Sequence, residues 1–222
     1  MGRRALCNID TSLDLSRHLL SFDDFPQPWN SAAMFGRSAP LEVELGTGKG
    51  LFISTAAAAC PQHDFLGIEV AARYARFAAA KLATRKLSNA RVAHCDGLRV
   101  FRELLIDSSV RAVHIYFPDP WWKTRHHKRR VMTTAFVRDA ERVLESSGRL
   151  HFWTDVKDYF DEALHVIANA TAFAGPLPVA QRAAEHHLDY RTHFERRVRL
   201  DGKPVYRAEF QKLNGQAAKN AE

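Results

Sequence analysis

The sequence predicts an α/β fold in which helices cover both faces of a mostly parallel sheet that ends in a C-terminal antiparallel hairpin. From residue 41 onward, short apolar runs alternate with helical patterns, a rhythm typical of parallel sheets. Near the end of the chain, Asp201-Gly202 separates two segments of alternating character, which is a hairpin signal. At 222 residues, with 46% hydrophobic content, the chain is long enough to bury a sizeable core in one domain.

The expected elements follow in order. Residues 41–45 form an apolar strand that leads into a glycine loop, and the Ala-rich segment 51–59 forms a helix that ends before Pro61. Further strands are expected at residues 65–70, 91–95, 112–117 and 149–153, and further helices at residues 71–87, 98–105, 133–144 and 156–168. Residues 193–200 and 204–213 would form the hairpin, whereas residues 1–40 show no clear period. The carboxyl ends of the parallel strands would share one edge, where α/β proteins bind ligands.

Charge and composition narrow the class of partner. An excess of 32 Lys and Arg over 25 Asp and Glu gives a net charge of +7 and a pI near 9.5, which favours an anionic partner. Cys7, Cys60 and Cys95 are far apart, which argues against a disulfide framework or a zinc site and for a reducing compartment. The sequence contains neither a signal-peptide pattern nor an apolar run long enough for a membrane span, so we expect a cytoplasmic protein.

The segment Glu44-Leu-Gly-Thr-Gly-Lys-Gly50 connects the first expected strand to a helix. A dinucleotide-binding loop requires glycine where this chain has Leu51, and a phosphate-binding loop requires Ser or Thr after Gly48-Lys49. Glu44 would repel a phosphate but suits a cationic ligand, such as the sulfonium and amino groups of S-adenosylmethionine. We therefore expect Gly46 and Gly48 to let the backbone approach this cofactor beside Glu44.

Two more acidic residues follow the next two expected strands. Glu69 ends the second strand, where a carboxylate can accept hydrogen bonds from vicinal ribose hydroxyls. Asp96 follows the third strand and can accept a hydrogen bond from the adenine amino group. Each acid alone is consistent with a solvated loop or a helix cap, but the three together favour a cofactor site.

A stiff acidic turn and a run of cations follow the fourth expected strand. Pro118 and Pro120 restrict the backbone on either side of Asp119. The cations come directly afterwards, in the segment Trp-Trp-Lys-Thr-Arg-His-His-Lys-Arg-Arg that spans residues 121–130. A rigid turn before a solvated basic surface is the plainer interpretation of this segment. The surrounding Lys and Arg also argue against a metal ion at His126 and His127, so no metal is expected.

The segment from Phe117 to Arg130 resembles the signature of the bacterial tRNA (guanine-N7-)-methyltransferases, Phe-Pro-Asp-Pro-Trp-x-Lys-x-Arg-His-x-Lys-Arg-Arg. The similarity extends to residues 44–50, 67–70, 154–155 and 192–196, and it spans residues 41–210. The chain departs from the family at Trp122, where many members have proline, and in its short N-terminal arm. The resemblance implies a Rossmann-like class I methyltransferase with a seven-stranded sheet. The implied reaction moves a methyl group from S-adenosylmethionine to N7 of a variable-loop guanine in tRNA, leaving S-adenosylhomocysteine.

The resemblance also implies roles for individual residues. The cofactor would be bound by Glu44, Glu69, Asp96 and Asp119, and Asp119 would also be the catalytic residue. The substrate would be contacted by Lys123, Asp155, Thr192 and Glu195, and the RNA by Arg125, His126, His127, Lys128, Arg129 and Arg130. Structural alternatives remain for three of these residues, because Asp155 is placed to cap the following helix, and Thr192 and Glu195 have capping-box spacing. The paired Trp121 and Trp122 are expected to pack beneath the loop rather than stack on a base.

We expect three regions along the chain: an arm over residues 1–40 that contributes to the RNA-binding surface, the methyltransferase domain over 41–214, and a polar tail over 215–222. The sequence leaves monomer and homodimer open. A small-molecule methyltransferase would not need the basic run, an RNA-binding module without activity would not need the three acids, and Leu51 disfavours a nicotinamide dehydrogenase.

Overall fold

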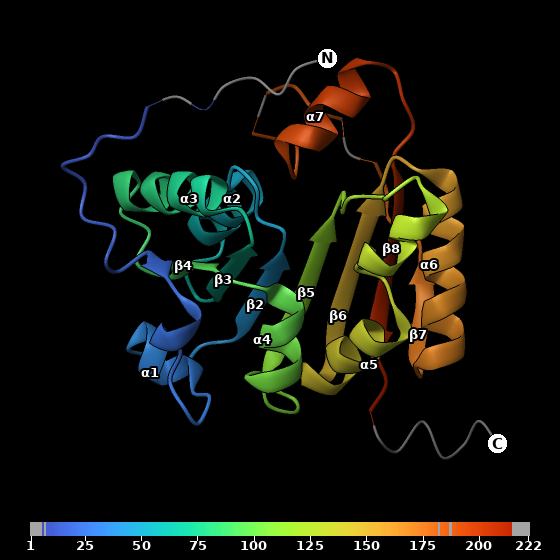
Figure 1. The fold of residues 1–222 in the computed structure, drawn as a ribbon, viewed down its shortest axis with the longest axis horizontal. Coiled ribbons are helices and arrows are strands. Elements are labelled where there is room, and N and C mark those ends of the chain that lie inside the picture. Colours follow the sequence, from blue (N-terminus) through green and yellow to red (C-terminus); the bar gives the residue numbers. More distant parts are fainter. Residues whose placement is uncertain (1–5, 7, 182, 187, 215–222) are drawn as a thin grey trace.

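The computed structural model of this protein describes residue 6 and residues 8–181, 183–186 and 188–214, without the side chains of Thr124 and Lys128. An eight-stranded sheet with the order β1-β4-β3-β2-β5-β6-β8-β7 runs through it (Figure 1). Its strands are Leu19–Leu20 (β1), Leu41–Leu45 (β2), Asp64–Glu69 (β3), Ala90–His94 (β4), Val110–Tyr116 (β5), Leu144–Thr154 (β6), Phe173–Leu177 (β7) and Tyr206–Lys212 (β8). The first six pair in parallel, and β8 is antiparallel to both β6 and β7. The predicted class, a mostly parallel α/β sheet with antiparallel C-terminal strands, is confirmed.

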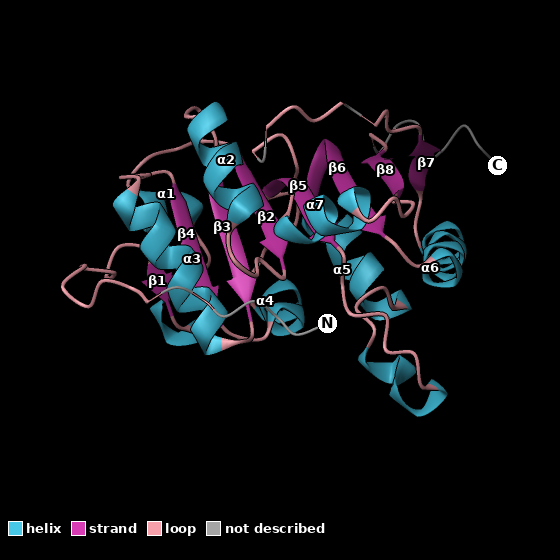
Figure 2. Ribbon diagram, turned by 90° about the horizontal axis from the view of Figure 1, so that it is seen from above, coloured by secondary structure: helices cyan, strands magenta, loops and turns pink. Residues whose placement is uncertain are grey.

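Helices cover the two faces of the sheet in separate groups (Figures 1 and 2). The helices are Ser31–Phe35 (α1), Leu51–Ala59 (α2), Ala72–Thr84 (α3), Gly97–Glu103 (α4), Thr134–Val143 (α5), Lys157–Ala170 (α6) and His193–Leu200 (α7), with 3-10 turns at Phe22–Asp24 (η1) and Thr124–Arg129 (η2). Side chains of α4, α5 and α6 share one core with alternate residues of the strands, whereas α2 and α3 pack on the opposite face against β3 and β4. Helix α7 lies over the upper ends of β5 and β6 in both views.

The pleat of the central strands explains this division. Val113 and Ile115 on β5 point into the larger core, while His114 and Tyr116, between and after them, point to the other face. On that second face, α3 presents small residues such as Ala75 and Ala78, which allow it to approach the sheet and the glycine loop closely. The alternation that predicts these strands is therefore also what separates the two helical layers.

The expected strand at residues 193–200 is wrong. These residues form α7, in which the Thr192 side chain accepts a hydrogen bond from the Glu195 backbone N–H at 2.9 Å and Val198 is buried. Asp201-Gly202 ends this helix, with Gly202 at φ 67°, instead of turning a hairpin. The antiparallel neighbour of β8 within the C-terminal region is β7, which precedes α7 in the chain.

The N-terminal residues are joined to the sheet. Leu19–Leu20 add an eighth strand beside β4, so the sheet exceeds the expected seven strands by one short edge strand. Phe25 and Trp29 are buried in the larger core, and Arg99 of α4 lies over the ring of Phe22 at 3.8 Å. Among the described residues, no helix is long and apolar enough to cross a membrane.

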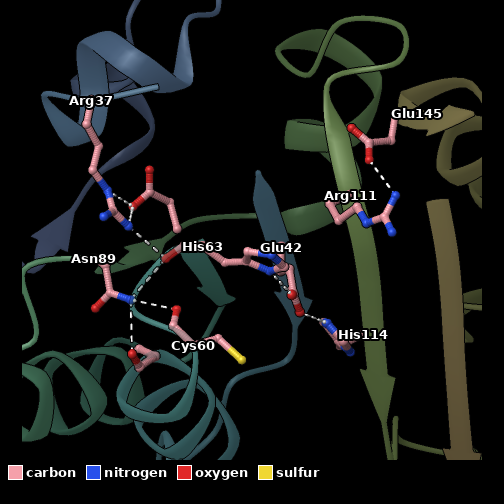
Figure 3. A network of polar contacts seen from close by, with 10 residues as sticks. Arg37, Glu42, Cys60, His63, Asn89, Arg111, His114 and Glu145 are labelled. Carbon is pink, nitrogen blue, oxygen red and sulfur yellow. Dashed lines mark hydrogen bonds and ion pairs between the residues drawn. The ribbon is translucent and has the colours of Figure 1, made fainter. Parts of the chain in front are cut away.

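A polar network ties β2 and β5 to the turn before β3 (Figure 3). Glu42 lies between two imidazoles, with 2.6 Å from its Oε1 to His63 Nδ1 and 2.7 Å from its Oε2 to His114 Nε2. The Asn89 amide donates to three backbone carbonyls around this turn, including that of His63 at 3.0 Å. These contacts satisfy polar groups on the face of the sheet that is not occupied by the larger core.

Candidate functional site

The glycine loop after β2 is shaped by backbone conformations that favour glycine. Gly46, Gly48 and Gly50 have φ values of 84°, 55° and 65°. A Cβ added at Gly50 would lie 2.7 Å from the Ala78 Cβ, so this glycine also allows α3 to pack against the loop. At Gly46 no heavy atom lies within 4 Å of an added Cβ, so the start of the loop faces open space. The loop is therefore both tightly supported and accessible to a ligand.

Glu69, at the end of β3, holds this loop in place. One carboxylate oxygen accepts from the Gly48 N–H and the other accepts from the Ala71 N–H, both at 2.8 Å. Each oxygen has a second lone pair for a further donor. The carboxylate is thus preorganised beside the glycine loop, where ribose hydroxyls were expected to bind.

Glu44, on β2, is a buried acid without a complete set of partners. It is 3% exposed, and its Oε2 has no hydrogen-bond partner among the described residues. Burial raises the pKa of Glu44 well above its usual range, and the nearby charge of Glu69 raises the pKa further. The nearby Thr47 hydroxyl offsets part of this rise in the pKa of Glu44, although Thr47 Oγ1 does not meet the geometry of a hydrogen bond to the carboxylate. A buried, unsatisfied acceptor of this kind suits a cationic ligand that supplies the missing donor.

Asp96 lies at the next strand end along the sheet. It follows β4, is exposed, and caps α4 by accepting from the Leu98 N–H at 2.9 Å. Gly97 brings this helix against β2, because an added Cβ would lie 2.0 Å from a Leu45 methyl carbon. The helix-cap interpretation of Asp96 is therefore correct, and its exposed carboxylate remains at the edge that carries Glu44 and Glu69.

The loop after β5 holds Asp119 between two strained residues. Phe117 and Trp121 have positive φ values of 52° and 46°, which non-glycine residues rarely adopt. The Phe117 N–H donates to the Trp153 carbonyl at 2.7 Å, which fixes the start of the loop to β6. Asp119 is exposed and forms no hydrogen bond or ion pair with the described residues. Strain on both sides of an acid without partners is typical of a functional loop.

Arg130 anchors the far end of this loop. It is buried, donates through Nε to the Pro120 carbonyl at 2.8 Å, and forms an ion pair with Glu162 on α6. Its guanidinium also lies 4.9 Å from the centre of the Tyr159 ring. The structure thus directs Arg130 into the protein, unlike its expected RNA-binding neighbours.

The cations between these anchors face outward. Lys123, Arg125 and Arg129 are exposed, and His126 and His127 are half-buried; the side chain of Lys128 lies outside the described part of the structure. In Figure 1 this segment is the yellow-green loop beside the upper end of α6. No group of three or more His, Cys, Asp and Glu side chains positioned to hold a metal ion occurs in the described ranges.

Asp155, after β6, is not a helix cap. The first free N–H near the start of α6, that of Val156, donates to Thr154 Oγ1 at 3.2 Å instead, and α6 has no side-chain cap. The half-buried Asp155 carboxylate forms no hydrogen bond or ion pair with the described residues. The capping alternative is therefore wrong, and this acid remains available at the same edge of the sheet.

The expected substrate residues at the start of α7 have structural partners. Thr192 is the N-cap of α7, as the capping alternative holds. Glu195 is 2% exposed; its Oε1 pairs with Arg207 at 3.1 Å and Arg199 at 3.3 Å, and its Oε2 accepts from the Arg191 N–H at 2.6 Å. The second half of a capping box is absent, because Glu195 reaches the Arg191 N–H rather than that of Thr192.

Two further residues join α7 to the site: Arg191, which was not expected from the sequence, and Phe194, which lies in the stretch 192–195 that the family resemblance assigns to the substrate. The Arg191 guanidinium lies over Phe52 at 5.6 Å and over Trp153 at 5.9 Å. The Phe194 ring lies 5.0 Å from that of Phe117, the strained residue that begins the Asp119 loop. In the sequence, Arg191 and Phe194 are marked only by lying beside or within the family segment 192–196. That position does not reveal which aromatic rings they contact. Through them, α7 packs against the loop that carries Asp119.

Comparisons with known proteins agree with this geometry. The model of a family described as "Putative methyltransferase" matches residues 38–208. A tRNA (guanine-N(7)-)-methyltransferase of Rhodopirellula baltica is 46% identical over 96% of this chain and 80% of its own length. A protein of the same name from Stutzerimonas stutzeri is 37% identical over 91% of this chain and 81% of its own length.

A solved structure supports the fold independently. A SAM-dependent O-methyltransferase of Thermotoga maritima superposes with a TM-score of 0.53 at 14% identity, covering 83% of this chain and 63% of that one. At this identity the likeness concerns the fold, which is that of class I S-adenosylmethionine-dependent methyltransferases. Together with the close relatives, these findings show that the chain belongs to the tRNA (guanine-N(7)-)-methyltransferase family.

Proposed function

We propose that this protein methylates N7 of a guanine in tRNA, the variable-loop guanine by family resemblance, with S-adenosylmethionine as the methyl donor. The observation that carries the proposal is the gathering of acids at one edge of the sheet. Glu44 with its unsatisfied oxygen, the preorganised Glu69 and the partner-free Asp119 lie on β2, at the end of β3 and after β5, which adjoin in the sheet. Exposed cations follow Asp119 directly, which adds an RNA-binding surface to a cofactor site.

The residues of the glycine loop fit the cofactor. When bound, S-adenosylmethionine supplies an electrophilic methyl group on a positively charged sulfur. Glu44 would offer its orphaned oxygen to the cationic end, and Gly46 and Gly48 would let the backbone approach closely. Glu69 would accept from ribose hydroxyls through the lone pairs that its backbone donors leave free, and Asp96 would accept from the adenine amino group.

Methylation at guanine N7 needs alignment rather than a base. The N7 lone pair lies in the plane of the ring, so no proton has to be removed before it attacks. Positive charge develops on the purine as the methyl group arrives, and Asp119 would stabilise this charge and accept hydrogen bonds from the guanine edge. The proline-bounded, strained loop holds this carboxylate in position before the substrate binds.

The remaining site residues would bind the substrate. We propose that Lys123, Asp155, Thr192 and Glu195 surround the guanine. Because the Glu195 carboxylate already has three protein partners, its contact with the guanine would require exchange of at least one of them.

We propose that the basic loop binds phosphates through the exposed Lys123, Arg125 and Arg129. His126, His127 and Lys128 would contribute by family resemblance. Arg130 would act from within, by holding the loop against α6. For the N7 atom of a guanine in folded tRNA to reach the site, that guanine would have to unstack in part. The proposal places the enzyme in the cytoplasm, with residues 1–40 contributing to the RNA-binding surface.

A direct experiment compares two otherwise identical tRNA transcripts, one with guanosine and one with 7-deazaguanosine, which has a carbon in place of N7. The proposal predicts transfer of labelled methyl groups to the first transcript and none to the second. Equal labelling of both would refute methylation at N7, and labelling of neither would refute tRNA as the substrate. A small-molecule methyltransferase would label neither transcript.

A further inference from the structure

We propose that Trp122 is a stacking platform for an unpaired base of the RNA substrate. The inference rests on the proposed function and adds a base-binding site to it. The Trp122 indole is 71% exposed, whereas the Trp29 and Trp153 side chains are each 6% exposed in the interior. It forms no aromatic or cation–π contact with the described residues, so the expectation that it packs beneath the loop is wrong.

The neighbouring tryptophan shows what a packed indole looks like in this loop. Trp121 is half-buried, with His126 edge-on at 5.8 Å and the Arg129 guanidinium 5.0 Å from its ring centre. Its positive φ of 46° turns the chain at this point. One indole therefore supports the loop, and the next is exposed to solvent.

The surroundings of Trp122 favour a nucleic acid as the occupant. Lys123, Arg125 and Arg129 are exposed within seven residues of it, and the loop between Trp122 and Arg130 contains no acid. Exposure alone does not indicate a partner, because single apolar side chains are common on protein surfaces. Trp122 differs from the other exposed apolar residues in being an aromatic ring within this run of cations. Cations that hold phosphates next to an aromatic ring that stacks on a base are the combination by which proteins bind unpaired nucleotides.

This site would act on binding and not on the chemical step. A base stacked on Trp122 would be held equally before and during methyl transfer, so its loss should raise KM and leave kcat unchanged. A Trp122 that merely supported the Asp119 loop would instead lower kcat when removed. The division of the effect between KM and kcat therefore separates base stacking from a structural role.

The experiment measures tRNA binding and steady-state methylation for Trp122→Ala and Trp122→Phe. Ile106→Ala serves as the control, because Ile106 is 52% exposed but precedes β5 at the opposite edge of the sheet. Loss of one base–aromatic stack predicts a dissociation constant that is roughly 5- to 150-fold higher for Trp122→Ala. Trp122→Phe should bind within a few-fold of the wild type, because a phenyl ring can also stack, and Ile106→Ala should be unchanged.

Intrinsic fluorescence gives a second readout. The most exposed of the four tryptophans should be the one that a stacked base quenches, so tRNA should quench the wild type much more than Trp122→Phe. Equal affinity of Trp122→Ala and the wild type, with wild-type methylation intact, would overturn the stacking site alone. Absence of methylation by the wild type would instead overturn the proposed function. A fall in kcat for Trp122→Ala at unchanged tRNA affinity would assign the residue to loop structure.

Discussion

The buried carboxyl of Glu44 predicts that cofactor binding depends on pH. Burial and the charge of Glu69 raise the pKa of Glu44 in the free protein, so a proton occupies this site at pH values where an ordinary glutamate is ionised. A sulfonium ligand would favour the ionised form and lower this pKa. Binding should therefore release a proton, and affinity should rise with pH up to the pKa of Glu44 in the free protein.

The size of this pH effect is set by the titration of a single group, the Glu44 carboxyl. Below that pKa, affinity should change by about tenfold for each pH unit, because one proton is exchanged. Glu44→Gln keeps the shape but removes the charge that would pair with the ligand. A hydrogen bond to a charged group contributes about 1.5–3 kcal/mol, so affinity should fall roughly 10- to 150-fold and lose this pH dependence.

Calorimetry in two buffers with different ionisation enthalpies measures the proton directly. The wild type should release up to one proton per bound S-adenosylmethionine, and Glu44→Gln should release correspondingly less. Glu145→Gln is a matched control, since Glu145 is a half-buried glutamate that pairs with Arg111 (Figure 3) and lies at the start of β6, whereas Asp155 and the other candidate site residues lie at or beyond the strand ends. The account fails if Glu44→Gln binds the cofactor with wild-type affinity and the same proton release.

Three other perturbations test separate parts of the account. Asp119→Asn should lower the single-turnover methylation rate and leave tRNA affinity within a few-fold, as measured by rapid quench and filter binding; an unchanged rate would make the loop purely structural. Replacing Arg125 and Arg129 with alanine should weaken tRNA binding and flatten its logarithmic salt dependence by about one unit of slope per lost phosphate contact, with cofactor affinity unchanged; an unchanged slope would remove these residues from the RNA surface. Burial lowers the pKa of His114 from 6.5 to about 4, because the folded protein favours the neutral imidazole. The free energy of unfolding should therefore be highest above pH 6.5 and should fall as the pH is lowered toward 4, where the unfolded chain takes up this proton first. This contribution is on the order of 3 kcal/mol, and urea titrations should show a weaker acid destabilisation in His114→Gln; an identical pH profile would contradict the assignment.

The sequence predicts the parallel part of the fold well because its signals are local. Short apolar runs such as residues 41–45 are bounded by glycine or proline, and the acids directly after them are placed at the ligand edge by topology alone. Glu69 and Asp96 therefore lie at the expected strand ends. The glycine loop is equally local, since its positive φ values need glycine wherever the chain folds.

Other features depend on contacts that no local pattern encodes. The segment 193–200 combines apolar and charged residues in an order that fits a strand or a helix, and a following Asp-Gly can end either one. Tertiary packing of Val198 and the cap at Thr192 favour the helix. Leu19–Leu20 pair with β4 without any periodicity of their own, because two residues are too few to show one.

The local sequence also does not predict which side chains point to the solvent and which point into the protein. Arg129 and Arg130 are adjacent cations in the basic run, yet the first is exposed and the second is buried against α6. The burial of Glu195 depends on Arg199 and Arg207, the second of which comes from β8. Residue type thus indicates the chemistry available in this segment, while the division between RNA-facing and structural roles is set by the packing of α6, α7 and β8.

The most direct test of the central claim is the identity of the methylated nucleoside. Wild-type protein is incubated with isotope-labelled S-adenosylmethionine and unmodified tRNA, and the RNA is then digested to nucleosides and separated by mass spectrometry. The account predicts that the label is recovered as 7-methylguanosine, and that much less label is recovered when Asp119→Asn replaces the wild type in a single-turnover reaction of the same duration. Label in a different nucleoside, or no label in the RNA while the protein binds the cofactor, would contradict it.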